Sequence, residues 1–279
     1  RVFPIKEVSD IGRKYNIPLI MDNTASPVIC KPIEHGAAIV IHSLTKYIGG
    51  HGTAVAGSIV DSGNFDWTAD PKRQPLFNEP DASYGGAIWG KVVPELTGAN
   101  IPFAVRARVC LLRDLGSALA PDNAFTIIQG LETVALRMKQ HCENAQKVVN
   151  FLKTHDEVTK VIYSTEHEKT IADRATKYLK GGNGPMVGIE LKGGIEAGKK
   201  FIESLKMFYH VANIGDARSL AIHPASTTHS QLNEKELAAS GVTQSYVRLC
   251  IGIEHIDDII EDLDQALNKS SKGNLKAVS

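Results

Sequence analysis

The sequence lacks the features that mark membrane proteins and nucleic-acid-binding proteins. Its 31 basic residues are balanced by 31 acidic residues, so no excess positive charge is available to bind a phosphate backbone. No apolar run approaches the length of a membrane span, and no secretory signal segment is recognisable. We therefore expect neither a nucleic acid nor a membrane as a partner.

Cysteine is also scarce, and the four cysteines, Cys30, Cys110, Cys142 and Cys250, lie far apart in the sequence. They form no Cys-x-x-Cys pair and no spacing typical of zinc ligands, so we expect no metal site. Scattered thiols of this kind indicate reduced cysteines in a cytoplasmic protein. A Gly-x-Ser-x-Gly motif is absent as well, which argues against a serine hydrolase that uses this nucleophile motif.

The sequence does contain polar residues at the ends of two neighbouring apolar segments. Residues 17–22 and 37–41 predict buried strands, and residues 55–61 predict a third. The first strand ends on Asp22, and the second is followed by two hydroxyl residues and Lys46. Ligands of open α/β sheets bind at such an edge. Lys46 precedes a glycine-rich turn, whereas the lysine of a nucleotide-binding P-loop follows its glycines, so the order argues against a P-loop enzyme.

Each of these residues has an ordinary structural interpretation when it is considered alone. A lysine after a strand is usually solvated, and an aspartate before a turn usually stabilises the turn. Together, Asp22, Lys46, Ser43 and Thr45 supply the groups that pyridoxal 5'-phosphate (PLP) requires, except the main-chain amides that bind its phosphate. PLP needs an amine for a Schiff base, a carboxylate to keep its pyridine nitrogen protonated, and donors for its phosphate.

Two segments also resemble a known family, the PLP enzymes of cysteine and methionine metabolism (the γ-family of fold type I). The segments are Asp-Asn-Thr-Ala-Ser-Pro at 22–27 and Ser-Leu-Thr-Lys-Tyr-Ile-Gly-Gly-His at 43–51. The family usually has alanine where this chain has Leu44. The resemblance implies that Lys46 is the Schiff-base lysine and that Asp22 pairs with the pyridinium. It also implies the roles of three hydroxyl residues: phosphate binding for Ser43 and Thr45, and a place beside the ring for Thr24.

The family fold is α/β, with a large domain like that of aspartate aminotransferase and a C-terminal α+β domain. The resemblance places the C-terminal part of the cofactor-binding large domain at residues 1–130 and the α+β domain at 131–279. Members of the family carry an N-terminal region that holds a phosphate-loop glycine, a ring-stacking tyrosine and an arm reaching the neighbouring subunit. That region does not precede Asp22 here, so we expect a fragment or a separate N-terminal chain, and an incomplete site.

Periodicity predicts the remaining elements. Helices are expected at 2–16, 101–119, 195–205 and 256–267, and strands at 158–163 and 186–192. The longest helix begins at Pro121, with Asp122 as its N-cap and Gly130 as a bend between domains. Its expected buried stripe consists of Ile128, Leu131, Ala135, Met138, Cys142, Ala145, Val149 and Leu152.

Two late segments carry further candidate residues. In the strand predicted at 246–251, Val247, Leu249 and Ile251 share one face, so Arg248 lies on the other. Spacing alone predicts an exposed arginine, but the resemblance implies that Arg248 binds the α-carboxylate of an amino-acid substrate. A planar guanidinium gives bidentate contact to that group. The resemblance also places Ser219 beside the same carboxylate, although small hydroxyl residues and proline predict a surface loop at 213–229.

The segment 215–220, Gly-Asp-Ala-Arg-Ser-Leu, is similar to the sulfhydrylase branch of the family. The implied reaction is a γ-replacement in methionine biosynthesis, in which O-acetylhomoserine and sulfide give homocysteine and acetate. The implied assembly is a cytoplasmic homotetramer. A cystathionine γ-synthase, a γ-lyase, and a non-catalytic fragment or assembly protein remain as alternatives.

Overall fold

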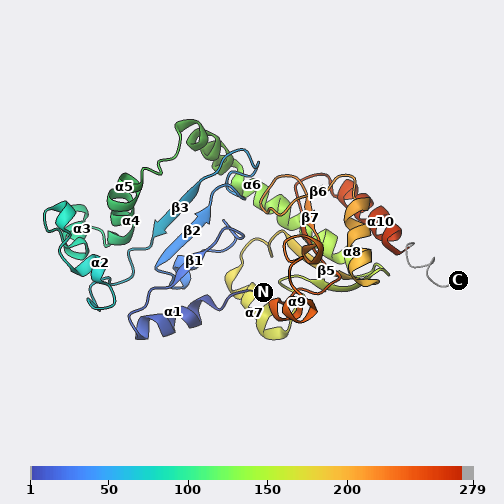
Figure 1. Cartoon of the computed structure of the whole chain (residues 1–279), viewed down its shortest axis with the longest axis horizontal. Helices are drawn as coiled ribbons and strands as arrows, with labels where there is room; N and C mark the ends of the chain where they lie inside the picture. Colours follow the sequence, from blue (N-terminus) through green and yellow to red (C-terminus); the bar gives the residue numbers. More distant parts are fainter. Residues whose placement is uncertain (1, 272–279) are drawn as a thin grey trace.

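The computed structural model describes residues 2–271, which form two β-sheets connected by one long helix (Figure 1). The first sheet consists of β1 (Ile20–Asp22), β2 (Ile39–Ser43) and β3 (Gly57–Asp61). The helices of this part are α1 (Ile5–Lys14), α2 (Pro75–Asn78), α3 (Trp89–Thr97), α4 (Pro102–Arg106) and α5 (Arg113–Leu115), with a π-helical segment at Ala107–Leu112. Short 3₁₀ helices occur at Pro32–His35, Ala82–Tyr84 and Pro224–Ser226.

The first sheet has the strand order β1-β2-β3, which confirms the three strands expected from the sequence. β2 runs parallel to β1 and antiparallel to β3. Ile39 in the central strand is fully buried and packs with an aromatic cluster that includes Trp67 and Trp89. The two outer strands are less covered, because Ile20 and Ile59 are 45% and 46% exposed. Within the described residues, this sheet therefore has open apolar surface on both edge strands.

Helix α6 (Pro121–Leu152) passes from the first sheet to the second (Figure 1). Pro121 occupies its first turn and Ala120 is its N-cap, so the prediction that Asp122 caps the helix is wrong. Proline suits the first helical position because its missing N–H would have no partner there. Gly130 lies within α6, where a side chain would collide with the main-chain oxygens of Ile48 and Gly49. This glycine permits close packing against the segment that follows Lys46.

The buried face of α6 differs from the predicted stripe in its N-terminal half. Ile128 and Leu131 are 54% and 52% exposed and Ala135 is also exposed, whereas Ile127 and Val134 are buried. The prediction assumed one continuous apolar core along the helix. In the structure, the N-terminal half packs instead against the turn after Lys46, through the face that carries Gly130. In the C-terminal half of α6, all the predicted positions are buried, namely Met138, Cys142, Ala145, Val149 and Leu152.

The second sheet has the order β4-β5-β8-β7-β6. Its strands are β4 (Val158–Ile162), β5 (Met186–Leu191), β6 (Tyr209–His210), β7 (Leu220–Ile222) and β8 (Tyr246–Cys250). The associated helices are α7 (Lys169–Tyr178), α8 (Gly194–Ser204), α9 (Glu234–Ser240) and α10 (Ile256–Ser271). All neighbouring strands are antiparallel except β6 and β7, which agrees with the α+β arrangement that the resemblance implies for this part of the chain.

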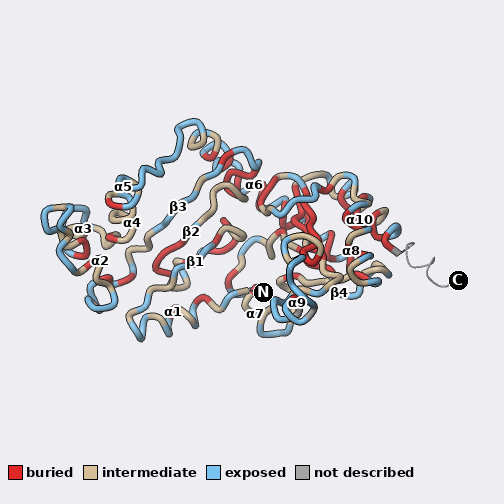
Figure 2. Tube along the Cα trace, in the orientation of Figure 1, coloured by how far each residue is buried: buried red, intermediate tan, exposed pale blue. Residues whose placement is uncertain are grey.

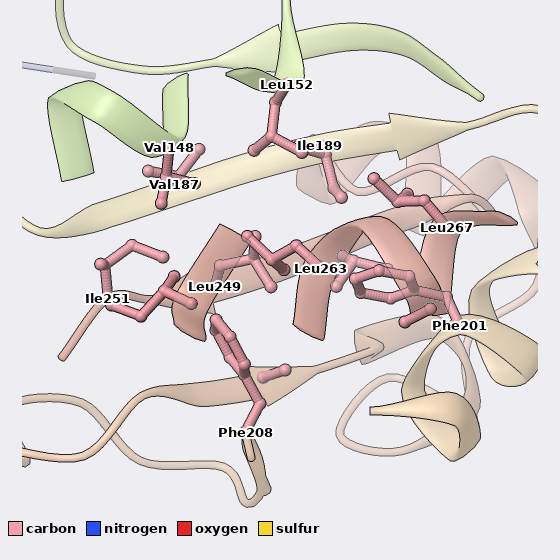
Figure 3. Close-up of a cluster of buried hydrophobic side chains, with 14 of the residues drawn as sticks. Val148, Leu152, Val187, Ile189, Phe201, Phe208, Leu249, Ile251, Leu263 and Leu267 are labelled. Carbon is pink, nitrogen blue, oxygen red and sulfur yellow. The ribbon is translucent and has the colours of Figure 1, made fainter. Parts of the chain in front are cut away.

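One face of the second sheet carries the largest apolar core (Figure 3). Side chains of β5 and β8 meet those of α6, α8 and α10 there, and Val187, Leu249 and Leu263 are fully buried. The buried segments in Figure 2 are concentrated around this core. The opposite face of β8 presents Tyr246 and Arg248 to a cavity between the two sheets.

The prediction of a surface loop at 213–229 is wrong for residues 220–222. Leu220, Ala221 and Ile222 form β7, and all three are at most 3% exposed. β7 pairs with β8, so its main-chain groups are satisfied inside the sheet. Composition suggested a loop because the strand is only three residues long and is flanked by small polar residues.

The four cysteines are all free, as expected, and all four are buried. Among residues 2–271, no helix combines the length and apolar character needed to cross a membrane. Within the same residues, no three His, Cys, Asp or Glu side chains converge in a way that could hold a metal ion.

Candidate active site

The polar residues singled out in the sequence lie at one edge of the first sheet. Because β1 and β2 are parallel and Asp22 pairs with Ile41, both strands end at the same edge. Lys46 follows the last residue of β2 within one turn, so it lies beyond the same edge as Asp22. The carboxyl ends of parallel strands are where open α/β sheets bind ligands.

One hydroxyl connects the ends of β1 and β2, and another joins the turn after β2 to the residue before β3. The Thr24 hydroxyl accepts a 2.8 Å hydrogen bond from the Ser43 amide, and the Thr45 hydroxyl accepts one of 3.0 Å from the Ala56 amide. The half-buried Ser43 hydroxyl has no partner among the described residues. It is therefore available to donate to an anion.

The Asp22 carboxylate is exposed toward a cavity between the two sheets. One of its oxygens accepts a 2.9 Å hydrogen bond from the Thr24 amide, which fixes its orientation. The cavity has a volume of about 370 Å³ and is also lined by Ser26, Tyr246 and Arg248. A carboxylate from the first sheet and a guanidinium from the second thus face one space. Lys46 is not among the residues that line it.

The Lys46 amine points toward the second sheet, where it donates to the side-chain oxygen of Asn213. Arg248 reaches the same residue, because its Nη2 donates to the Asn213 main-chain oxygen at 3.2 Å. The Arg248 Nε is buried and has no partner within the described residues. A buried guanidinium nitrogen without an acceptor is costly unless a ligand satisfies it. Lys46 and Arg248 are therefore brought together, and Arg248 has capacity left for an anionic ligand.

A buried arginine holds the glycine turn that follows Lys46. The Arg137 guanidinium donates to the main-chain oxygens of Tyr47 at 2.7 Å, Ile48 at 2.8 Å and Gly130 at 2.7 Å. Gly50 has φ +75°, and a side chain there would collide with this guanidinium. Burial lowers the pKa of Arg137, because the cation loses water and its hydrogen-bond partners among the described residues are neutral oxygens.

The segment around Gly215 packs directly on the glycine turn that follows Lys46. Gly215 has φ +79°, and a side chain there would collide with the main chain of Lys46 and Tyr47. Asp216 is buried and accepts two 3.0 Å hydrogen bonds from the side chain of Arg218. Burial alone would raise the pKa of Asp216, but the hydrogen bonds from Arg218 outweigh it and hold that pKa below its usual range. The two charges of this segment neutralise each other.

Comparison with known proteins decides the family. The sequence profile of the Cys/Met metabolism PLP-dependent enzymes matches residues 1–268. This chain belongs to that family. The O-acetyl-L-homoserine sulfhydrylase of Leptospira meyeri is 48% identical over 269 residues, which cover 94% of this chain and 60% of that protein.

Two solved structures of the PLP-dependent family share the fold. A Campylobacter jejuni protein described as an O-acetylhomoserine (thiol)-lyase superimposes with a TM-score of 0.86 at 38% identity, covering 96% of this chain and 63% of its own. Its structure contains an N'-pyridoxyl-lysine-5'-monophosphate. The cystathionine γ-synthase of Xanthomonas oryzae, in complex with aminoacrylate and cysteine, gives 0.75 at 29% identity, with coverages of 98% and 60%. These likenesses confirm the expected fold class.

The chain spans about 60% of the length of these PLP-dependent relatives. What it does contain fits the cofactor that the family uses, which agrees with the expectation from the sequence. The edge of the first sheet offers an amine, a carboxylate and a free hydroxyl, and Gly50 and Gly215 allow main chain to approach closely. These groups would hold a pyridine nitrogen, an aldehyde carbon and part of a phosphate.

Ser219 lies apart from the groups that converge on Lys46. Its side chain is fully buried, and its hydroxyl donates to Glu254 at 2.9 Å while accepting from the Gly252 amide at 2.9 Å. The residue of the same segment that contacts Lys46 and Arg248 is Asn213. Sequence reasoning passed over Asn213, although it opens the glycine turn at Gly215.

Arg137 was also missed, because an arginine within a helix is ordinarily solvated. Replacing it with leucine is expected to lower the free energy of unfolding by about 3 kcal/mol, since three buried carbonyls lose their donors. Denaturant unfolding of the full-length protein measures this. Lys139→Leu is the matched control, because the Lys139 side chain is 73% exposed on the same helix. Equal losses in the two variants would mean that Arg137 contributes nothing special to the turn.

Proposed function

We propose that this chain carries the lysine side of the active site of a PLP-dependent O-acetylhomoserine sulfhydrylase. The reaction is a γ-replacement in which O-acetyl-L-homoserine and sulfide give L-homocysteine and acetate. The observation that carries the proposal is the meeting of Lys46 and Arg248 on Asn213, beside the edge that bears Asp22. The name and 48% identity of the Leptospira meyeri relative support the choice of reaction.

In this proposal, Asp22 holds the pyridine nitrogen, Ser43 and Thr45 contribute donors to the phosphate, and Thr24 lies beside the ring. When bound, PLP supplies an electron sink for the charge that develops next to the substrate amine. The orientation of Asp22 by the Thr24 amide supports its assignment, since a fixed carboxylate needs no reorganisation to meet a cation.

The substrate roles fall to Arg248, Ser219 and Lys46. Arg248 binds the α-carboxylate of O-acetylhomoserine, and its unpartnered buried Nε supports this assignment. Ser219 supports the carboxylate site indirectly, because its hydroxyl accepts a hydrogen bond from the Gly252 amide just after β8. The Lys46 amine removes the Cα proton and gives it up again before it removes a Cβ proton as acetate leaves Cγ. After sulfide has added at Cγ, the amine returns one proton to Cβ and one to Cα.

The acceptor is sulfide rather than a second amino acid. Both oxygens of the Asp216 carboxylate are occupied by Arg218, so this segment offers no free acidic group to the ammonium of cysteine. Sulfide needs neither an ammonium partner nor a second carboxylate clamp. Discrimination then depends on a site that admits a small anion and leaves the charged groups of cysteine without partners.

The proposal is tested by assaying the full-length protein with O-acetylhomoserine and equal concentrations of sulfide or cysteine. We expect homocysteine to form at least about ten times faster than cystathionine, because unpaired charges penalise the amino-acid acceptor. Faster cystathionine formation would identify a cystathionine γ-synthase, and release of 2-oxobutanoate without an acceptor would identify a γ-lyase. No product with any acceptor would leave a non-catalytic fragment or assembly protein.

We also infer that the protein works in the cytoplasm as a homotetramer. Four free cysteines support the compartment. Exposed apolar side chains on α5 and α6 support self-association, with Leu115, Phe125 and Leu136 each more than 60% exposed. For the domains, we propose that residues 1–130 belong to the cofactor-binding domain and residues 131–279 to the C-terminal domain, with α6 spanning the boundary.

A further inference from the structure

Asn213 joins the two cations of the candidate site through different atoms. Its side-chain amide oxygen accepts from the Lys46 amine, and its main-chain oxygen accepts from Arg248 Nη2 at 3.2 Å. The Cys250 thiol also lies 3.7 Å from that main-chain oxygen. Lys46 follows β2 of the first sheet and Arg248 lies in β8 of the second, so Asn213 is a direct link between the two halves of the site.

The position of Asn213 is fixed by its surroundings. Two residues later, Gly215 presses on the main chain of Lys46 with a positive φ that favours glycine. The Ala217 amide donates to the Gly50 oxygen at 2.8 Å, which connects the C-terminal end of the segment 213–217 to the glycine turn that follows Lys46. Arg248 holds the near end from β8. The amide of Asn213 is therefore presented to Lys46 by a braced segment and not by a free loop.

The chemistry of the contact follows from its neutrality. An amide oxygen orients an amine by a hydrogen bond but carries no full charge. A carboxylate at the same place would attract the ammonium form and hold the proton on it. An amine that has to attack an aldehyde and later accept a proton must be free to lose its proton first. A neutral acceptor meets both needs, because it positions the nitrogen without favouring the charged state as strongly.

We propose that Asn213 is a positioning residue for Lys46. Its amide oxygen holds the Lys46 amine on the side of the site where Arg248 lies, and the amine remains able to deprotonate. This inference rests on the proposed function, because it assigns Asn213 to the same site. It differs from the role given to Ser219 in that Asn213 touches the reacting amine itself. Cofactor capture by Lys46 should accordingly depend on the charge of the side chain at this position.

The test uses the full-length protein freed of cofactor and then mixed with PLP over a series of pH values. At each pH, borohydride fixes the captured cofactor, and peptide mapping measures the fraction attached to Lys46. In Asn213→Asp, which keeps the size of the side chain and adds a charge, the pH midpoint of capture should rise by about one to three units. Asn150→Asp is the matched control, because Asn150 is exposed on α6, and its midpoint should stay at the unmodified value.

A second variant covers the case in which Asn213→Asp fails to fold. Asn213→Leu removes the acceptor without adding charge, so capture should slow by about tenfold while the midpoint stays unchanged. An unshifted midpoint in Asn213→Asp, or an unchanged rate in Asn213→Leu, would overturn the inference while capture at Lys46 in the unmodified protein still upheld the proposed function. If the unmodified protein captures no cofactor at Lys46, the proposed function fails, and the inference falls with it.

Discussion

Replacing Lys46 with arginine is expected to reduce the rate of homocysteine formation by at least about a thousandfold. Arginine keeps the positive charge and can still donate to Asn213, but its delocalised guanidinium is effectively always protonated. It can therefore neither attack an aldehyde nor remove a proton from carbon. The measurement is steady-state turnover of the full-length protein with O-acetylhomoserine and sulfide.

Lys160→Arg is a matched control for this substitution. Lys160 lies on β4, its side chain is 61% exposed, and its contact with Glu190 is a surface ion pair. Its replacement should leave turnover within about twofold of the unmodified rate, since it lies on the surface away from the site. Turnover of Lys46→Arg that matches Lys160→Arg would remove Lys46 from the chemistry altogether.

The second large effect is expected from Asp22→Asn, which should retain bound cofactor but lose turnover by about a hundredfold or more. The amide has nearly the shape of the carboxylate and can still accept from the Thr24 amide. It cannot stabilise a protonated pyridine nitrogen, so the cofactor would be a weaker electron sink. The measurements are cofactor content by absorbance and turnover under saturating substrate.

His42 provides a second measurement that does not depend on turnover. Burial lowers the pKa of this residue, and the negative charge of Asp22 partly opposes the effect. Asp22→Asn removes the opposing charge, so the pKa of His42 should fall further, and NMR titration of the imidazole measures it. Asp10→Asn is the control, because Asp10 is an exposed carboxylate on α1. It should change neither turnover nor the pKa of His42. Near-normal turnover in Asp22→Asn would show that the carboxylate is dispensable.

The elements of the site that sequence reasoning recovered depend on local patterns. The apolar run before Asp22 predicted β1. This strand pairs in parallel with β2, so both strands end at the edge where open α/β sheets bind ligands. Alternation along β8 was equally informative, because Val247 and Leu249 are buried in the core and Arg248 lies on the opposite face. In both cases a period of two or a strand boundary determines where the side chain points.

What sequence reasoning missed depends on contacts between distant segments. Ile127 rather than Ile128 is buried in α6, because the helix is rotated to bring Gly130 against the main chain of Gly49. No property of the helix sequence alone specifies that partner. The same holds for Asn213, whose contact with Lys46 joins residues 167 positions apart. A buried polar group is placed by its partners, and those become known only when the chain is folded.

In the proposed site, Lys46 carries the cofactor. The full-length protein with its bound cofactor should be reduced with borohydride, digested, and analysed by mass spectrometry of its peptides. We predict that the pyridoxyl label is found on the peptide that contains Lys46 and the glycine turn after it. A label on any other lysine, or an unlabelled protein, would show that Lys46 does not carry the cofactor.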